Sequence, residues 1–286
     1  MTEKVKHIVC YSGGHSSART AIEVVRKYGK ENVILVNHQC ILEPPDVDRF
    51  ERQVAEYLGV PITYVSFDGW ETKDQFDVVI EKGSFINPNG QARESLCTHV
   101  MKTEPFMRWL SENFPVTNSL FEERKECTIY YGFDANEDDR ILRRSSIMAA
   151  HGYRTAFPLA HWESTIQSTT EIGIEPPNSY AVFKHANCVG CLKAGWQHWY
   201  CVYVLHPEIW EKGKVAEDKI GYSIHKDYYL EEREEMFAKM VKCGIEPTEH
   251  IKSQTWWAMV KKILKEYDNT VCEISEENEK PCICFD

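Results

Sequence analysis

The chain lacks any long apolar run, and none reaches the roughly 18 residues that a membrane-spanning helix requires. Its first residues, MTEKVKHIVCYSGG, contain no extended apolar stretch of the kind found in export signals. Internal repeats and long low-complexity tracts are also absent. We therefore expect a cytoplasmic globular protein that makes no membrane contact.

Positive charge is scarce relative to negative charge. The 286 residues include 33 Lys and Arg against 44 Asp and Glu, a formal charge of −11. This balance argues against a broad surface for nucleic acids, although it leaves room for a local basic groove. The eleven cysteines, in a chain without an export signal, are expected to be thiols that pack, bind metal or catalyse.

Apolar periodicity predicts alternating strands and helices. Strands are predicted at 5–11, 32–38, 62–67 and 128–133, and helices at 18–28, 45–58, 103–113, 141–150, 231–242 and 254–265. This alternation favours an α/β fold with a doubly wound, mostly parallel sheet. We expect an α/β domain at 1–160, a helical C-terminal region with a Cys-x-x-Cys pair at 161–270 packed on it, and a flexible tail at 271–286.

A polar, glycine-rich turn joins the first predicted strand to the first helix, with the sequence Ser12-Gly13-Gly14-His15-Ser16-Ser17. In open parallel sheets, ligands bind beyond the carboxyl ends of the strands. Glycines let backbone N–H groups approach an anion, and the helix N-terminus adds a favourable dipole. The turn matches neither the Walker A pattern nor Gly-x-Gly-x-x-Gly. We interpret it as a phosphate cradle; a glycine turn with a serine cap is the alternative.

The segment Ser12-Gly13-Gly14-x-x-Ser17 resembles the loop of PP-loop adenine-nucleotide enzymes. Later motifs extend the resemblance to the phosphoadenosine-phosphosulfate (PAPS) reductase family, including its phage and mobile-element members. These motifs are Cys97-x-x-x-x-Lys102-x-x-Pro105, Gly132-x-x-x-x-Glu137-x-x-Arg140, and Pro158-Leu159-x-x-Trp162 followed by Cys188-x-x-Cys191. Their order over residues 7–210 is specific to the superfamily, and not to one reaction.

The resemblance implies a fold like that of the adenine-nucleotide alpha hydrolases, with ATP or a related adenine nucleotide and Mg²⁺ as cofactors. The implied nucleotide-binding residues are Ser12, Gly13, Gly14, His15, Ser16, Ser17 and Asn37. Asn37 lies at the end of the second strand, where an adenine or ribose would rest, although capping of the strand end is an equal alternative. Lys102 and Arg140 are the implied catalytic cations, and Glu137 either orients Arg140 or holds magnesium.

Two departures from the family pattern matter. His15-Ser16 stands where typical members carry Lys-Asp, which puts the cleavage of ATP in question. The terminal Glu-Cys-Gly-x-His segment of the reductases is also missing. Its nearest match is Cys243-Gly244, which we interpret as the end of a helix with Gly244 as its cap.

The pair Cys188-Val189-Gly190-Cys191 is the strongest indication of a metal site. The family motif makes Cys97 the natural third ligand, and Cys201 is a candidate fourth. A 4Fe–4S cluster, a structural Zn²⁺ and a metal-free or redox dithiol all stay open. Cys282 and Cys284 in the tail are either a sulfur relay or incidental.

These features lead to three hypotheses. The first is an ATP-dependent, pyrophosphate-releasing enzyme that transfers sulfur to a nucleic-acid or small-molecule acceptor, with a donor such as a cysteine desulfurase. The second is a sulfonucleotide (PAPS/APS) reductase that uses a thiol nucleophile and thioredoxin. The third is a non-catalytic nucleotide-binding protein. A homodimer stays open.

Overall fold

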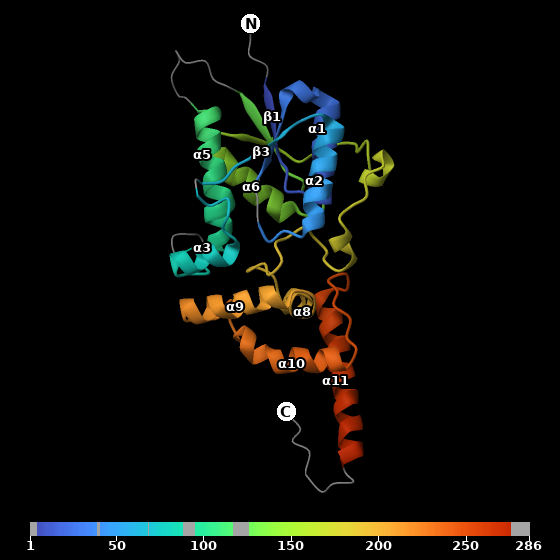
Figure 1. The fold of residues 1–286 in the computed structure, drawn as a ribbon. Coiled ribbons are helices and arrows are strands. Elements are labelled where there is room, and N and C mark those ends of the chain that lie inside the picture. Colours follow the sequence, from blue (N-terminus) through green and yellow to red (C-terminus); the bar gives the residue numbers. More distant parts are fainter. Residues whose placement is uncertain (1–4, 39–40, 68, 88–94, 117–125, 276–286) are drawn as a thin grey trace. The chain divides into compact units, whose positions relative to one another are not determined.

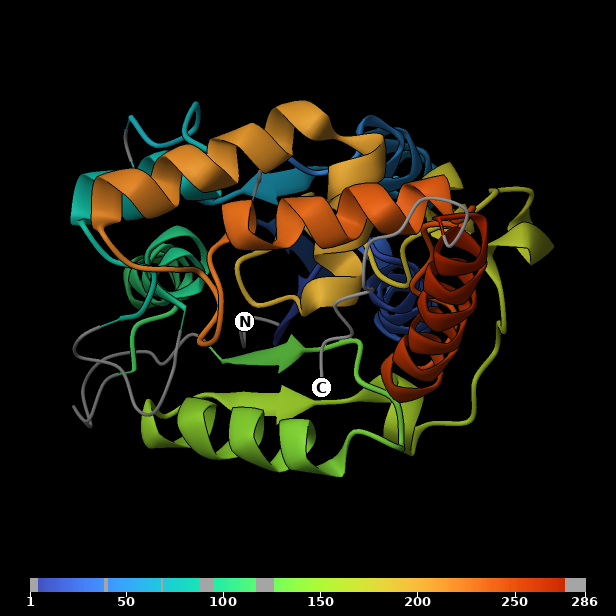
Figure 2. The ribbon, with the colours of Figure 1, turned by 90° about the horizontal axis from the view of Figure 1, so that it is seen from below.

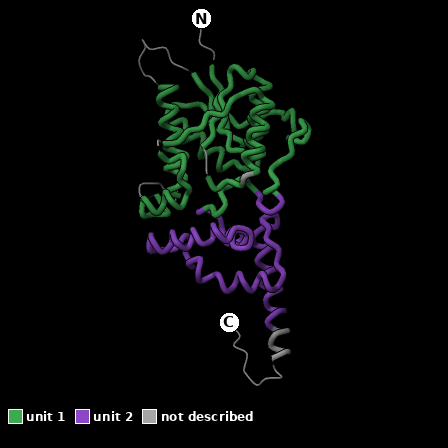
Figure 3. The backbone as a smooth tube through the Cα atoms, in the orientation of Figure 1, with its two compact units in different colours: residues 1–180, 185–191 green, residues 181–184, 192–286 purple. Residues whose placement is uncertain are grey.

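The computed structural model describes residues 5–38, 41–67, 69–87, 95–116 and 126–275. The chain divides into two compact units, which are coloured separately in Figure 3 and described separately here. Unit 1 comprises residues 1–180 and 185–191, and unit 2 comprises residues 181–184 and 192–286. The expectations for Cys282 and Cys284 and for the tail from residue 276 lie outside the described residues.

The described part of unit 1 forms a five-stranded parallel sheet in the order β3-β2-β1-β4-β5. The strands are β1 (Lys6–Cys10), β2 (Val33–Asn37), β3 (Ile62–Tyr64), β4 (Cys127–Tyr130) and β5 (Arg154–Ala156). In register, Ile8 of β1 lies opposite both Ile34 of β2 and Ile129 of β4. The strand order reverses beside β1, as at the switch point of Rossmann-like α/β sheets, where ligand crevices form.

Two helical layers cover the sheet of unit 1 (Figure 1). Helices α1 (His15–Tyr28) and α2 (Pro45–Leu58) lie on one face, and α5 (Glu104–Asn113) and α6 (Asp138–Ala150) lie on the other. Figure 2 shows α6 running alongside β5. Helices α1 and α2 end at Gly29 and Gly59, as the sequence predicts. The expected α/β class with a parallel sheet is therefore confirmed.

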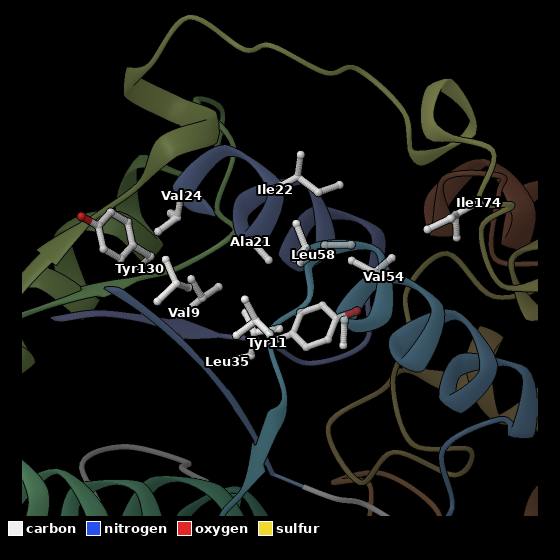
Figure 4. Packing of buried hydrophobic residues seen from close by; sticks show 14 of the residues in the cluster. Val9, Tyr11, Ala21, Ile22, Val24, Leu35, Val54, Leu58, Tyr130 and Ile174 are labelled. Carbon is white, nitrogen blue, oxygen red and sulfur yellow. The ribbon is translucent and has the colours of Figure 1, made fainter. Parts of the chain in front are cut away.

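Each face of the sheet has its own apolar core. Figure 4 shows side chains of α1 and α2, among them Ile22 and Leu58, packed over Val9 and Leu35 of the sheet. The second core lies under α5 and α6 and includes Leu110 and Met148. Apolar positions spaced at three and four residues account for this one-sided burial of the helices.

Shorter elements connect the strands and helices. They are η1 (Lys30–Asn32), α3 (Gln75–Lys82), α4 (Leu96–Thr98), the π-helical turn η2 (His99–Thr103), α7 (Pro158–His161), η3 (Thr169–Ile172) and η4 (Asn178–Ala181). Three strands differ from expectation: β3 stops at Tyr64 and β4 at Tyr130, each three residues early, and the three-residue β5 was not predicted. A strand this short carries too little periodicity to be recognised from sequence.

The predicted boundary at residue 160 is wrong, because unit 1 continues to residue 180 and includes residues 185–191. The physical reason is a clamp on α1. The buried Glu23 carboxylate accepts hydrogen bonds from Thr165 N–H and Ile166 N–H, and Ile166 enters the core beside α1. The Cys-x-x-Cys pair therefore belongs to unit 1 and not to the helical C-terminal region.

Unit 2 consists of α8 (Trp196–Leu205), α9 (Pro207–Ile220), α10 (Leu230–Lys242) and α11 (Ser253–Ser275). Helix α11 continues to residue 275, five residues into the region expected to be a flexible tail. Trp199, Trp210, Phe237 and Trp256 are buried in this unit and form its aromatic core. No helix in the described part of the chain is long and apolar enough to cross a membrane.

Gly132, just after β4, lies directly against the first turn of α1. A Cβ atom at this position would lie 2.9 Å from the carbonyl oxygen of Ser16 and 3.0 Å from the nitrogen of Ser17. Both contacts are with backbone atoms, which cannot rotate away as a side chain would. Only glycine allows the turn after β4 to approach α1 this closely.

We predict that Gly132→Ala lowers the free energy of unfolding by roughly 1–3 kcal/mol, the usual cost of overpacking. Urea unfolding and thermal melting would measure the change. Gly195→Ala is the matched control, because a Cβ there meets no atom within 4 Å. Equal stability of the two variants would contradict the proposed close contact.

Candidate functional site

The glycine-rich turn lies at the carboxyl end of β1 and leads directly into α1. Gly13 has φ +69°, and a Cβ there would lie 2.8 Å from Cγ1 of Val47 in α2. Both the backbone conformation and the close approach of α2 therefore require glycine at this position. Gly14 caps α1 in an extended conformation, so the first N–H groups of the helix point out of the turn.

Ser17 holds the turn together from within. Its buried hydroxyl donates to the Gly14 carbonyl at 2.8 Å and accepts a hydrogen bond from Ser12 N–H at 3.2 Å. The Ser12 hydroxyl lies 3.4 Å from the Ser17 hydroxyl oxygen. Ser17 therefore shapes the cradle rather than lining it, while Ser16 contributes the backbone on which Gly132 rests.

His15 does not replace the charge of the lysine that typical PP-loop members carry. Its Nε2 accepts a hydrogen bond from Thr169 N–H at 3.3 Å. Burial lowers the pKa of His15, and the nearby Arg19 lowers it further, against the opposing charge of Asp134. A neutral imidazole tied to η3 positions the first turn of α1 and adds no positive charge at neutral pH.

The backbone N–H of His15 also has a partner that no motif includes. It donates to the hydroxyl oxygen of Tyr180 at 3.0 Å. Burial raises the pKa of the Tyr180 hydroxyl, while backbone hydrogen bonds from His15 and Ala186 act in the opposite direction. A phenol oxygen therefore lies over the N-terminus of α1, where an anion is favoured.

Asn37, at the end of β2, is buried and donates from Nδ2 to the carboxyl group of Glu51 in α2. Burial raises the pKa of Glu51 to about 8, so the group is mostly protonated at neutral pH. Its carboxyl carbon lies 3.8 Å from the position of a Cβ on Gly13. Sequence reasoning missed Glu51, since it looks like any charged residue of an amphipathic helix.

Positive charge gathers on the other side of the turn, near the ends of β1, β2 and β4. Burial, together with the charges of Lys102 and Arg144, lowers the pKa of His38 to about 4. The charge of Arg144 also acts to lower the pKa of the Cys10 thiol at the end of β1. Lys102 lies in η2, a π-helical turn of the kind often found at functional sites. Lys102 and Arg144 form what we call the basic pair.

Arg140 and Glu137 bind each other instead of facing the basic pair. Glu137 also accepts a hydrogen bond from Asp134 N–H at 2.9 Å. The Arg140 guanidinium lies 4.2 Å from the centre of the Phe133 ring and is largely exposed. With both carboxylate oxygens engaged, Glu137 orients Arg140, the first of the two roles expected for it. Arg144 is the arginine nearer the strand ends, because its charge acts on Cys10 and His38.

Three cysteines of unit 1, Cys97, Cys188 and Cys191, belong to segments that contact α3. Val189, between Cys188 and Cys191, donates from its N–H to the Leu42 carbonyl at 2.8 Å, and its own carbonyl accepts from Gln75 at 2.8 Å. Cys97 lies in α4, which packs against α3, and its sulfur lies 2.9 Å from the Ser95 hydroxyl.

Cys201 has a different environment from these three cysteines. It is fully buried in α8 of unit 2, and burial raises the pKa of its thiol to about 12. Cys201 is therefore part of the apolar core of unit 2. Among the described residues, no three His, Cys, Asp or Glu side chains are grouped so that they could hold a metal ion. A metal centre at Cys97, Cys188 and Cys191 stays a prediction from the motifs.

Comparison with known proteins adds no assignment. No family model matches the chain, and no curated protein matches it significantly. The candidate site consequently depends on its own geometry and on the motifs.

Glu51 leads to a prediction about pH dependence. Its pKa is about 8 in the folded protein against a reference value of 4.5, so only the unfolded chain ionises between these values. The contribution of Glu51 to the free energy of unfolding is complete below pH 4.5. It falls by up to about 1.4 kcal/mol per pH unit between pH 4.5 and pH 8. We predict that the Glu51→Gln variant does not lose stability in this way. The stability of the variant relative to wild type should therefore rise from pH 5 to pH 8.

Urea unfolding of both proteins across this pH range tests the prediction. Glu56→Gln, an exposed position on the same helix, is the control and should show no such trend. A constant difference between Glu51→Gln and wild type would mean that Glu51 is ionised in the folded state.

Proposed function

We propose that the chain is an adenine-nucleotide-binding enzyme of the PP-loop type, with a fold like that of the adenine-nucleotide alpha hydrolases. It would bind ATP over Ser12–Ser17, activate an acceptor by adenylation with release of pyrophosphate, and serve sulfur transfer. The observation that carries this proposal is the glycine turn between β1 and α1 at the switch point of the sheet.

The electrostatics of the site support an anionic ligand. The N-terminus of α1 favours negative charge, and the basic pair supplies two cations beside the ends of β1 and β2. On the opposite side, the one buried carboxyl described at the turn, Glu51, is mostly neutral at pH 7. A triphosphate would therefore meet attraction from the basic pair and little repulsion from Glu51.

Each group has a definite chemical role in this proposal. Backbone N–H groups of the turn bind phosphate oxygens, and the basic pair stabilises charge that develops as pyrophosphate leaves. Mg²⁺ would neutralise the phosphates and typically takes one or two carboxylates, with phosphate and water as its other ligands. Asp134, whose charge acts on His15, is the carboxylate that fits this position.

The reductase alternative is less favoured by the local structure around Cys243. Helix α10 ends here, with Gly244 at φ +71° and hydrogen bonds from Gly244 and Ile245 to Val241 and Met240. Cys243 is thus part of a helix cap, as expected.

Binding without turnover is the second candidate function, because the neutral His15 stands where a lysine would contact the phosphates.

We predict that Lys102→Ala weakens binding of MgATP about tenfold, because one cation of the basic pair is lost. Titration calorimetry would measure the affinity, and a coupled assay would measure pyrophosphate release. Lys30→Ala is the control, since Lys30 precedes β2 at the opposite, amino edge of the sheet. Equal effects of the two substitutions would contradict the location of the site. Binding without pyrophosphate release would favour the second candidate.

Metal content is a separate prediction, in which Cys97, Cys188 and Cys191 bind either an iron–sulfur cluster or zinc. After anaerobic purification, iron, sulfide and zinc are measured in wild type, Cys188→Ala and Cys201→Ala. We expect metal in wild type and Cys201→Ala and its loss in Cys188→Ala. Metal-free wild-type protein would exclude the metal centre and leave a dithiol.

A further inference from the structure

Tyr180 is the residue of the candidate site that neither the motifs nor the proposed chemistry include. It belongs to η4, far along the chain from the glycine turn, yet its hydroxyl oxygen accepts the His15 N–H at 3.0 Å. A Cβ on Gly14 would lie 3.5 Å from this oxygen and 3.7 Å from the Ala186 side chain. The hydroxyl therefore lies directly on the cradle.

The position of this oxygen is the one expected for a ligand oxygen. The first N–H groups of a helix have no acceptor within the helix, and the hydrogen bonds of α1 begin with Ala18 N–H to the Gly14 carbonyl. The N–H of His15 is thus among the donors that a bound phosphate would use. In the structure this donor is already bound to the phenol of Tyr180.

A clamp on α2 holds the segment that carries Tyr180. Arg49 donates to the carbonyl groups of Glu175 and Pro176 at 3.1 and 3.2 Å, and Asp46 accepts the N–H of Asn178. Asp46 and Arg49 are themselves paired at 2.8 Å. The clamp explains why a residue so distant in sequence reaches the N-terminus of α1.

We propose that the Tyr180 hydroxyl occupies the position of a phosphate oxygen and competes with the nucleotide for the His15 N–H. The inference rests on the proposed function and adds a residue that sets nucleotide affinity. Binding of the phosphate requires the phenol to leave the cradle, which costs its hydrogen bonds to the backbone. The clamp formed by Asp46 and Arg49 opposes this movement.

The test compares wild type with Tyr180→Phe, using inorganic pyrophosphate and MgATP as probes in titration calorimetry. We expect about tenfold tighter binding by the variant, equivalent to ~1.4 kcal/mol, because no hydroxyl competes for the N–H. The melting temperature of the ligand-free variant should fall, since the same hydrogen bond is lost. A purely structural tyrosine would not raise affinity while lowering stability. Tyr57→Phe, exposed on α2, is the control.

A second variant tests the clamp without changing the tyrosine. Asp46→Ala releases the segment and should also tighten binding, whereas Asp48→Ala, which breaks the neighbouring pair with Arg52, should not. Unchanged or weaker binding by Tyr180→Phe, with wild-type binding intact, overturns this inference alone. Absence of binding by both wild type and Tyr180→Phe overturns the proposed function, and the inference with it.

Discussion

The contact between Gly132 and the backbone of Ser16 and Ser17 is the constraint on which the candidate site depends. It brings the turn after β4 against the first turn of α1, so that two crossover connections meet beside β1. Because both partners are backbone, the distance between the two turns is set by the main chain. The groups that follow from each turn, such as His15 and Asp134, are placed by this contact.

Around this contact, the site separates its charges by face. Lys102 and Arg144 lie on the side of α5 and α6, and the Glu51–Asn37 pair lies on the side of α2. Burial keeps the Glu51 carboxyl protonated at neutral pH, while the cations stay close to the strand ends. The same physical effect, desolvation, thus removes a negative charge from one side of the turn and keeps His38 neutral on the other.

Tyr180 gives the proposed site a further property. The first N–H of the cradle is already bound to the Tyr180 hydroxyl, so a nucleotide bound as we propose would have to replace an existing interaction. The affinity of such a site depends on the difference between two hydrogen-bonded states and not on the cradle alone. The neutral His15 also lowers the nucleotide affinity of the proposed site, because it supplies no charge to attract the phosphates.

The sequence alone predicted the parallel α/β sheet, the C-terminal ends of α1 and α2, and the glycine turn, because these depend on local periodicity and on glycine at fixed positions. It placed the start of α1 three residues late, at residue 18 instead of His15. It did not predict α8, whose side chains are apolar nearly all round and therefore show no amphipathic period. Only the tertiary structure decided that Arg144 lies nearer the strand ends than Arg140, that Cys201 is core, and that Glu51 and Tyr180 reach the turn. These outcomes depend on burial and on contacts between residues distant in sequence, such as His15 and Tyr180, which no local pattern encodes.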